Sequence, residues 1–188
     1  MPLAVSEDSE IVMFRAEIGV EEHFAVLIGT GANSGTPLVR LHSQCITGDI
    51  LGSLKCDCGE QLQSAMHLMA ENGGGILVYL AQEGRDIGLM NKMRAYALQD
   101  NGLDTVDANH VLGFNTDERL FLPAARILQA LDVSKIQLIT NNPDKISQLE
   151  KYGIDVTERV PLTLEANPHN RHYLETKQKR TGHLIDNF

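Results

Sequence analysis

The feature that most constrains the fold is a helix-periodic segment followed closely by a short apolar run, a pattern that occurs twice. Over Glu60 to Asn72 apolar residues recur at helical spacing, and Ile76 to Leu80 then has the length and composition of a strand buried on both faces. A second unit places a helix from Pro123 and a strand over Ile136 to Thr140. Strands that alternate with helices predict an α/β layered sheet.

The N-terminal part of the chain makes this sheet mixed. Apolar residues alternate between Ile11 and Ile28 around Gly19, which predicts an antiparallel β-hairpin. Further expected elements are a strand over Leu38 to Leu41, a polar loop over Gln82 to Gly88, a helix over Leu89 to Gln99, a helix capped by Asp144 that runs to Tyr152, and a strand that starts with Ile154 to Val156. We therefore expect an α/β fold in a single domain, with a mixed β-sheet layered with helices and an N-terminal β-hairpin. Residues 1–166 would form this catalytic domain, and residues 167–188 a polar, flexible C-terminal tail.

Composition and charge narrow the class of function. The chain has 188 residues, of which 43% are apolar and 22% charged, as in an ordinary protein that buries its own core. Its net charge of -9 would repel a nucleic-acid backbone or an anionic membrane surface. The first ten residues lack the basic start and apolar core of a signal peptide, and no stretch approaches ~20 consecutive apolar residues. We expect a cytoplasmic protein that binds neither nucleic-acid polymers nor membranes.

The three cysteines are the strongest functional signal. Cys45, Cys56 and Cys58 cannot all pair within one chain, and their close spacing suits a metal better than a disulfide framework. Three thiolates bind zinc tightly and leave a fourth tetrahedral position for water, whose pKa the metal lowers to about 7. Two alternatives stay open, namely three ordinary buried thiols and a structural zinc whose fourth ligand is His42.

Several motifs surround and follow the cysteines. They are Arg40 to Asp49, Ser53 to Leu62, Gln82 to Leu89, Asn91-Lys92, Arg94 to Asp100, Asp104-Thr105-Val106, Asn109-His110, Asp117-Glu118-Arg119, Thr140 to Pro143, Glu158 to Pro161 and, in the tail, His172-Tyr173-Leu174. With these motifs, nearly the whole chain beyond Thr36 resembles GTP cyclohydrolase II, the zinc enzyme that opens riboflavin biosynthesis.

The resemblance implies a homodimer in which Cys45, Cys56 and Cys58 hold one zinc ion per chain. It implies that GTP loses pyrophosphate and that its carbon 8 leaves as formate, which gives 2,5-diamino-6-ribosylamino-4(3H)-pyrimidinone 5′-phosphate. Mg²⁺ accompanies the triphosphate in such enzymes. The family often occurs fused to a second riboflavin-pathway domain, for which this chain is too short, so we expect a monofunctional enzyme.

The resemblance also assigns roles to single residues. Arg119 matches the nucleophile that takes the guanylyl group, Asp117 matches its proton acceptor, and Tyr96 matches a tyrosine that accompanies complete deformylation. Because a guanidinium stays protonated in proteins, a second role for Arg119, stabilisation of the transition state alone, stays open. The residues implied to bind the nucleotide are Arg40, Leu41, His42, Ser43, Gln44, Gln61, Glu83, Gly84, Arg85, Thr105, Thr140 and Lys145.

Two residues depart from the family pattern. Gln44 stands where Glu is common and Asp86 where Asn or Gly is common, which affects the expected rate and affinity more than the reaction type. The chain is thus expected to be a hydrolase acting on a cyclic amidine. The alternatives are a paralogue that stops at a formamidopyrimidine and a non-catalytic, zinc-stabilised nucleotide-binding module. A zinc deaminase would need His-x-Glu and Pro-Cys-x-x-Cys, and the sequence contains neither.

Overall fold

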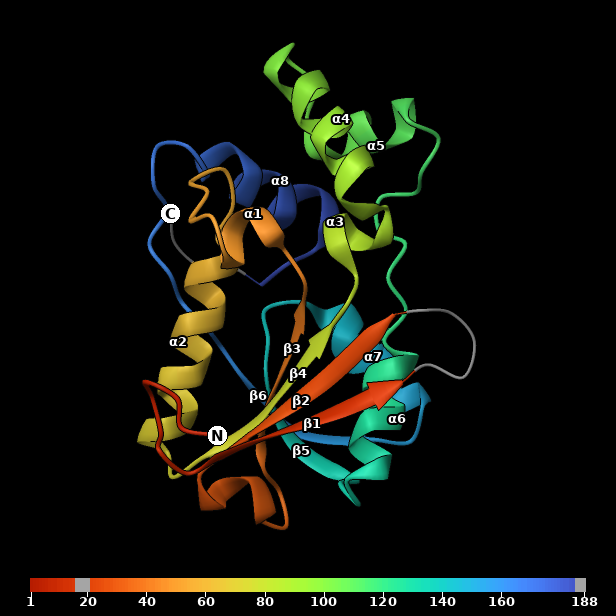
Figure 1. The fold of residues 1–188 in the computed structure, drawn as a ribbon. Coiled ribbons are helices and arrows are strands. Elements are labelled where there is room, and N and C mark those ends of the chain that lie inside the picture. Colours follow the sequence, from red (N-terminus) through yellow and green to blue (C-terminus); the bar gives the residue numbers. More distant parts are fainter. Residues whose placement is uncertain (16–20, 185–188) are drawn as a thin grey trace. The chain divides into compact units, whose positions relative to one another are not determined.

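The computed structural model describes residues 1–15 and 21–184 and contains a six-stranded sheet in the order β1-β2-β4-β3-β5-β6 (Figure 1). The strands are β1 (Ser9–Arg15), β2 (Glu22–Ile28), β3 (Leu38–Ser43), β4 (Gly75–Leu80), β5 (Lys135–Ile139) and β6 (Asp155–Val160). β2 pairs antiparallel with β1 and β4, whereas β5 pairs parallel with β3 and β6. The predicted mixed α/β sheet with its N-terminal antiparallel hairpin is confirmed. Gly19, the expected centre of the hairpin, lies outside the described residues.

The helices include every one that the sequence predicts, together with others that it does not. They are the 3-10 helix η1 (Thr30–Asn33) and the α-helices α1 (Ile46–Asp49), α2 (Cys58–Glu71), α3 (Glu83–Asp86), α4 (Gly88–Asp100), α5 (Thr105–Val111), α6 (Leu122–Ala130), α7 (Pro143–Lys151) and α8 (Arg171–Thr181). Within the part of the chain that the structure describes, none of the helices is both long and apolar enough to span a bilayer.

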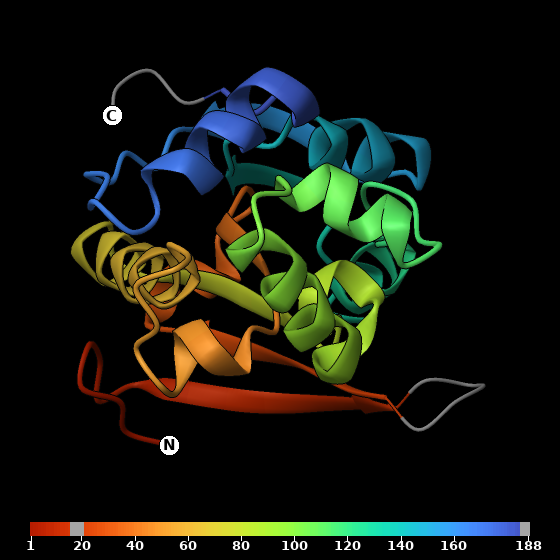
Figure 2. The same ribbon diagram turned by 90° about the horizontal axis from the view of Figure 1, so that it is seen from above.

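The chain divides into two compact units, each made of three segments. The first unit comprises residues 1–42, 62–81 and 120–162, and holds nearly all of the sheet with most of α2, α6 and α7. The second unit comprises residues 43–61, 82–119 and 163–188, and holds α1, α3, α4, α5 and α8. In the second unit α5 contacts both α4 and α8 (Figure 2). The expected domain boundary at residue 166 stays a prediction.

The core of the first unit lies on both faces of the sheet. Helices α6 and α7 pack on one face through Ala124, Leu128 and Leu149, and α2 covers the other face through Ala65 and Met69 (Figure 1). Ile76, Val78 and Leu80 of β4 belong to the apolar core on the side of α6 and α7. Leu77 belongs to the core on the side of α2, because side chains alternate along a strand. The uninterrupted apolar run of β4 is therefore buried on both faces, as predicted.

Three local features differ from the sequence-based expectations. The N-cap of α7 is Asn142, whose side chain accepts a hydrogen bond from the Asp144 amide, so the prediction of Asp144 as the cap was wrong. The loop expected over Gln82 to Gly88 contains the short helix α3. Within the expected C-terminal tail, residues 171–181 form α8, with Leu174 and Lys177 buried. The flexibility of this tail stays a prediction.

Candidate metal centre and nucleotide site

Three cysteine sulfurs converge in the second unit. Cys45 directly precedes α1, Cys58 begins α2, and Cys56 lies two residues earlier. Their Sγ atoms all lie within 4.8 Å of one another, and those of Cys45 and Cys56 are 3.7 Å apart. A Cβ on Gly48 of α1 would lie 3.0 Å from the Cys56 sulfur and 3.2 Å from that of Cys45. The glycine therefore leaves the space that the three sulfurs occupy.

The buried Lys92 of α4 holds a cation against this cluster. Its Nζ donates hydrogen bonds to the Cys45 sulfur at 3.0 Å, to Thr47 Oγ1 at 2.8 Å and to Glu83 Oε1 at 2.9 Å. Burial disfavours the ammonium, but the hydrogen bonds with Glu83 and Cys45 outweigh it and raise the pKa of Lys92. Lys92 is thus a fixed positive charge beside one of the three sulfurs.

Hydrogen bonding divides the three thiols into unequal partners. Hydrogen bonds from Cys56 and Cys58, with a further one from Lys92, lower the pKa of Cys45 far below the ordinary thiol value. The hydrogen bonds with Cys45 raise the pKa values of Cys56 and Cys58. Because metals take cysteine as the thiolate, a metal bound by all three residues would displace the remaining protons.

The segment around α3 is held in an unusual backbone conformation. Gly84 and Arg85 have φ angles of 65° and 60°, and Asp86 has a φ of 74°. Asn and Gly, the common residues of the resembled family at position 86, tolerate such angles best. Glu83 accepts hydrogen bonds from the Ile46 amide at 2.7 Å and from Lys92, so its carboxylate positions protein groups; its role in nucleotide binding stays a prediction.

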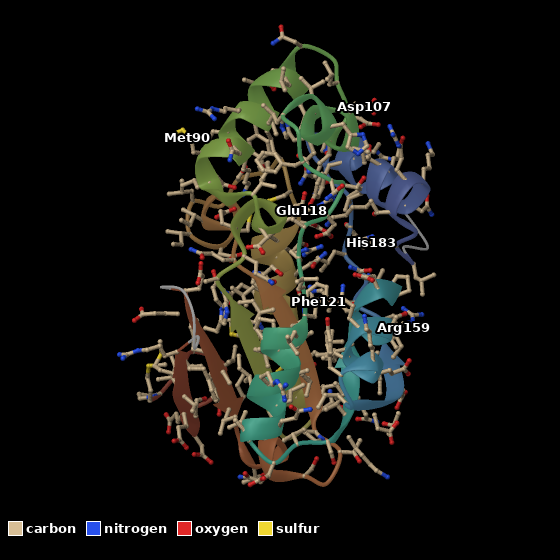
Figure 3. The ribbon with its side chains drawn as sticks, turned by 90° about the vertical axis from the view of Figure 1, so that its right-hand side faces the viewer. Met90, Asp107, Glu118, Phe121, Arg159 and His183 are labelled. Atoms are coloured by element: carbon tan, nitrogen blue, oxygen red, sulfur yellow. The ribbon has the colours of Figure 1, made fainter. Side chains whose placement is uncertain are left out.

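Asp117 and Arg119 lie on an extended stretch before α6, marked in Figure 3 by the residue between them, Glu118. The Arg119 Nη2 and Nε donate to the two Asp117 carboxylate oxygens at 2.5 and 2.8 Å. Burial opposes both charges, but their mutual hydrogen bonds and attraction outweigh it, lowering the pKa of Asp117 and raising that of Arg119. Arg119 also donates to the Ser43 hydroxyl at 3.4 Å. Both residues lie on a non-helical stretch, and their roles in catalysis stay predictions.

Arg85 belongs to the same neighbourhood. Its Nη1 donates to the Thr116 carbonyl at 3.1 Å, its own carbonyl accepts from the Glu118 amide at 3.3 Å, and its charge helps to lower the pKa of Asp117. The structure thus brings the predicted residues Arg85, Asp117, Arg119 and Ser43 together. Two guanidinium groups beside a single carboxylate leave a net positive charge suited to phosphate.

Tyr96 lies on α4, one turn beyond Lys92. The Lys92 Nζ lies 5.7 Å from the centre of its ring, and the exposed Lys55 Nζ lies 5.1 Å away. Burial raises the pKa of the Tyr96 phenol, more than the charge of Lys92 lowers it. The phenol is therefore a proton donor, not a phenolate, at neutral pH.

Five of the predicted residues belong to the first unit, at or near the carboxyl ends of the parallel strands β3 and β5. Arg40 donates to the Ile139 carbonyl at 3.0 Å, and the Lys145 Nζ donates to the Leu41 carbonyl at 2.7 Å. The ring of His42 stacks on Tyr79 with 5.3 Å between centroids, and the Thr140 hydroxyl accepts from the Asn142 amide at 3.0 Å. The Leu41 side chain is fully buried in the core, so any contact of Leu41 with a ligand would be through its backbone.

The other predicted residues of the second unit lie on separate segments. Gln61 donates to the Asp57 carboxylate at 2.5 Å. Thr105 is the first residue of α5, directly after its N-cap Asp104, and Gln44 follows the end of β3. The roles of these residues in nucleotide binding stay predictions.

Comparison with known sequences decides the family. The profile of GTP cyclohydrolase II matches residues 1–161. The chain belongs to the GTP cyclohydrolase II family. It is 52% identical over 185 residues to a GTP cyclohydrolase-2 of Azospirillum brasilense and 53% identical over 165 residues to one of Pectobacterium atrosepticum. It is also 48% identical over 178 residues to the riboflavin biosynthesis protein RibBA of Cytophaga hutchinsonii.

These relatives differ in length. The matched part is 98% of this chain but 48% of the Azospirillum protein, and 95% of this chain but 44% of RibBA. The chain thus spans about half the length of these two relatives. In the Pectobacterium GTP cyclohydrolase-2, by contrast, 88% of this chain matches 84% of the protein.

Sequence reasoning about this GTP cyclohydrolase II family member missed two charged residues of the candidate site. Asp57 could have been noticed from its place between two cysteines, since a carboxylate there borders any metal that they bind. Lys92 belongs to the Asn91-Lys92 motif, but nothing in the sequence indicates its burial, because a lysine on a predicted helix is usually exposed. Only the structure places its amine on Cys45.

Proposed function

We propose that this chain hydrolyses GTP and opens the imidazole ring of its guanine, with release of formate and pyrophosphate. The product would be 2,5-diamino-6-ribosylamino-4(3H)-pyrimidinone 5′-phosphate, the first intermediate of riboflavin biosynthesis. Family membership supports the class of reaction. The observation that carries the proposal is the convergence of three cysteine sulfurs within 4.8 Å of one another.

The donor set fits one zinc ion per chain, held by Cys45, Cys56 and Cys58. Tetrahedral zinc with Zn–S bonds of about 2.3 Å separates neighbouring sulfurs by about 3.8 Å; the Cys45 and Cys56 sulfurs are 3.7 Å apart. Among the described residues of the second unit, no histidine, aspartate or glutamate joins the three cysteines, which favours a centre with three protein ligands. When bound, zinc supplies a Lewis acid that activates water near neutral pH for attack on an electron-poor carbon.

Arg119 and Arg85 would bind the phosphates, with Mg²⁺ arriving on the triphosphate as part of the substrate. Release of pyrophosphate spreads negative charge over oxygens, which fixed guanidinium groups stabilise. The ion pair with Asp117 raises the pKa of Arg119 and so favours charge stabilisation over attack by a deprotonated guanidine. Rapid quench with labelled GTP tests this assignment: a trapped guanylyl enzyme would establish Arg119 as the nucleophile, and absence of an adduct with activity retained in Arg119→Lys would exclude it.

Tyr96 would act in the removal of the formyl carbon. Its protonated phenol can donate a hydrogen bond or a proton to a departing nitrogen or to a formyl oxygen, which are the groups that change charge in amide hydrolysis. This role distinguishes the proposal from a paralogue that stops at the formamidopyrimidine.

We further propose a homodimer. Leu89, Met90 and Met93 are exposed and share one face of α4, because residues three and four apart are neighbours on a helix. Met90 points outward from this helix (Figure 3). Ile50, Leu51 and Leu54 of the same unit are also exposed. Apolar surface of this kind is typical of a contact with a second copy.

The decisive experiment is one assay on the purified, zinc-loaded protein with GTP and Mg²⁺. Formate, pyrophosphate and the pyrimidine are quantified together by mass spectrometry, and the three are expected in equal amounts. Cys56→Ser, which removes one sulfur, should abolish formate release. A formamidopyrimidine product would identify the paralogue, and GTP binding without either small product would identify a non-catalytic module. Full formate release by Cys56→Ser would remove the metal from the mechanism.

A further inference from the structure

Helix α8 carries a buried lysine that reaches the loop of the metal ligands. The Lys177 Nζ lies 2.7 Å from Asp57 Oδ1, and the two side chains are only 10% and 5% exposed. Asp57 is the residue between Cys56 and Cys58. Lys177 and the ligand loop are 120 residues apart in sequence and belong to the same compact unit.

The Asp57 carboxylate is anchored on both of its oxygens. Lys177 donates to Oδ1, and Gln61 donates to Oδ2 at 2.5 Å. The ammonium also lies 4.4 Å from the centre of the Tyr173 ring on the same helix. Because a buried carboxylate is costly unless it is paired, these donors fix the residue that connects two metal ligands.

The outer end of α8 has a second, weaker attachment. Arg180 Nη1 donates to Asp104 Oδ2 at 2.6 Å and to Asp107 Oδ1 at 3.1 Å. Asp104 caps α5 and precedes Thr105. The Arg180 side chain is 41% exposed, so water and salt screen this pair and it should contribute less than the buried one.

The family profile ends at residue 161, before this helix, whereas the match to the Azospirillum GTP cyclohydrolase-2 covers 185 residues of the chain. The sequence of α8 is dominated by charged and polar residues, which is why a polar tail was expected. The helix buries the apolar side chain of Leu174, and the Lys177–Asp57 pair is a buried contact between the helix and the loop of the metal ligands.

We propose that Lys177 is a positioning residue of the metal centre, which acts through Asp57 to hold Cys56 and Cys58 in the geometry that the metal needs. This inference rests on the proposed function, in which these cysteines bind zinc. Loss of Lys177 leaves a buried carboxylate without its cation. Asp57 then moves towards water and carries the two flanking ligands with it. Groups that orient metal ligands in this way typically change metal affinity by about 10- to 100-fold when removed.

The test uses the full chain with Lys177→Met, which keeps the apolar stem and removes the charge. The matched control is Lys179→Met on the same helix, since Lys179 is exposed and pairs with Glu175. Zinc affinity is measured by competition with a chromophoric chelator, and the thiolate-to-metal absorption of the Co²⁺-loaded protein reports the ligand geometry. We expect about 10- to 100-fold weaker zinc binding and an altered cobalt spectrum for Lys177→Met, with no change for Lys179→Met.

A second pair of variants separates positioning from folding. Lys177→Arg keeps the cation and should restore most of the zinc affinity. Asp57→Asn combined with Lys177→Met removes both charges, so this protein should fold even where the single variant does not, yet still bind zinc weakly. Equal zinc affinity and equal cobalt spectra for Lys177→Met, Lys179→Met and the unaltered chain would overturn the role of Lys177. An unaltered chain that binds no zinc would overturn the metal centre itself, and this role with it.

Discussion

Replacement of Gly48 by Ala should weaken metal binding without straining the backbone. Gly48 does not have a left-handed φ, and alanine is favoured over glycine within a helix by about 0.5–1 kcal/mol. The added Cβ, however, would lie 3.0 Å from the Cys56 sulfur, 3.0 Å from Cys58 Cβ and 3.2 Å from the Cys45 sulfur. The helix therefore favours alanine at position 48, whereas the space needed by the cysteine sulfurs favours glycine.

The size of the effect follows from these distances. Contacts this short require the cysteines to move by a few tenths of an ångström. Metal–ligand distances tolerate only about 0.2 Å, so the displaced sulfurs cannot all keep good bonds. A disturbance of this kind weakens metal binding by about 10- to 100-fold, which corresponds to about 1.4–2.7 kcal/mol.

Zinc affinity by chelator competition and formate release from GTP provide the assay. Gly35→Ala is the matched control, because a Cβ there meets no atom within 4 Å and its φ is also not left-handed. Gly48→Ala should lose zinc affinity and formate release together, while Gly35→Ala keeps both. If Gly48→Ala bound zinc as tightly as the unaltered chain, the argument that its missing side chain makes room for the ligands would be refuted.

Three further predictions address other parts of the site. Tyr96→Met removes the protonated phenol and should accumulate a formamide intermediate detectable by mass spectrometry; an unchanged product would contradict the role of Tyr96. Burial raises the pKa of Asp117, but the hydrogen bonds and charge of Arg119 lower it by more. The Asp117 carboxylate therefore stabilises the fold above about pH 3.9, the pKa of an aspartate in the unfolded chain. This stabilisation is lost as the pH falls through the lower pKa that Asp117 has in the folded chain. Asp117→Asn should therefore cost about 1–3 kcal/mol in urea unfolding at pH 7 and progressively less towards pH 3, whereas a pH-independent cost would contradict the ion pair. Met90→Glu with Met93→Glu should convert the proposed dimer to monomer in sedimentation velocity, while Met13→Glu, at an exposed methionine of β1, should not; a dimer that survives the first pair of changes would exclude this face of α4.

The sheet and its covering helices could be predicted because their apolar residues have the period of the element that they form. Ala65 and Met69 are buried at the positions that helical spacing indicates, and the β4 run is buried on both faces. Helix α8 could not be predicted in this way, because its most consequential buried side chain is a lysine. Helix α5 did offer a signal, since Asp104 caps it, but the segment is too short for apolar periodicity to show.

The candidate site could be predicted where its residues lie close together in the sequence. Three closely spaced cysteines indicate a shared ligand before any fold is known. The partners of charged residues are different, because they depend on which segments meet. The contacts of Lys92 with Cys45 and of Lys177 with Asp57 join residues 47 and 120 positions apart, and no local pattern reports them.

The register of the parallel strands bears on the synthesis of the chain. Leu38 of β3 pairs with Gln137 of β5, about 100 residues later, so at about 5–20 residues per second a ribosome takes roughly 5–20 s to supply the neighbour. Throughout that interval an apolar strand that becomes central to the sheet has an open edge, a state prone to aggregation. The yield of folded protein should thus depend on translation speed and on chaperones that shield nascent chains, more than on the stability of the finished molecule.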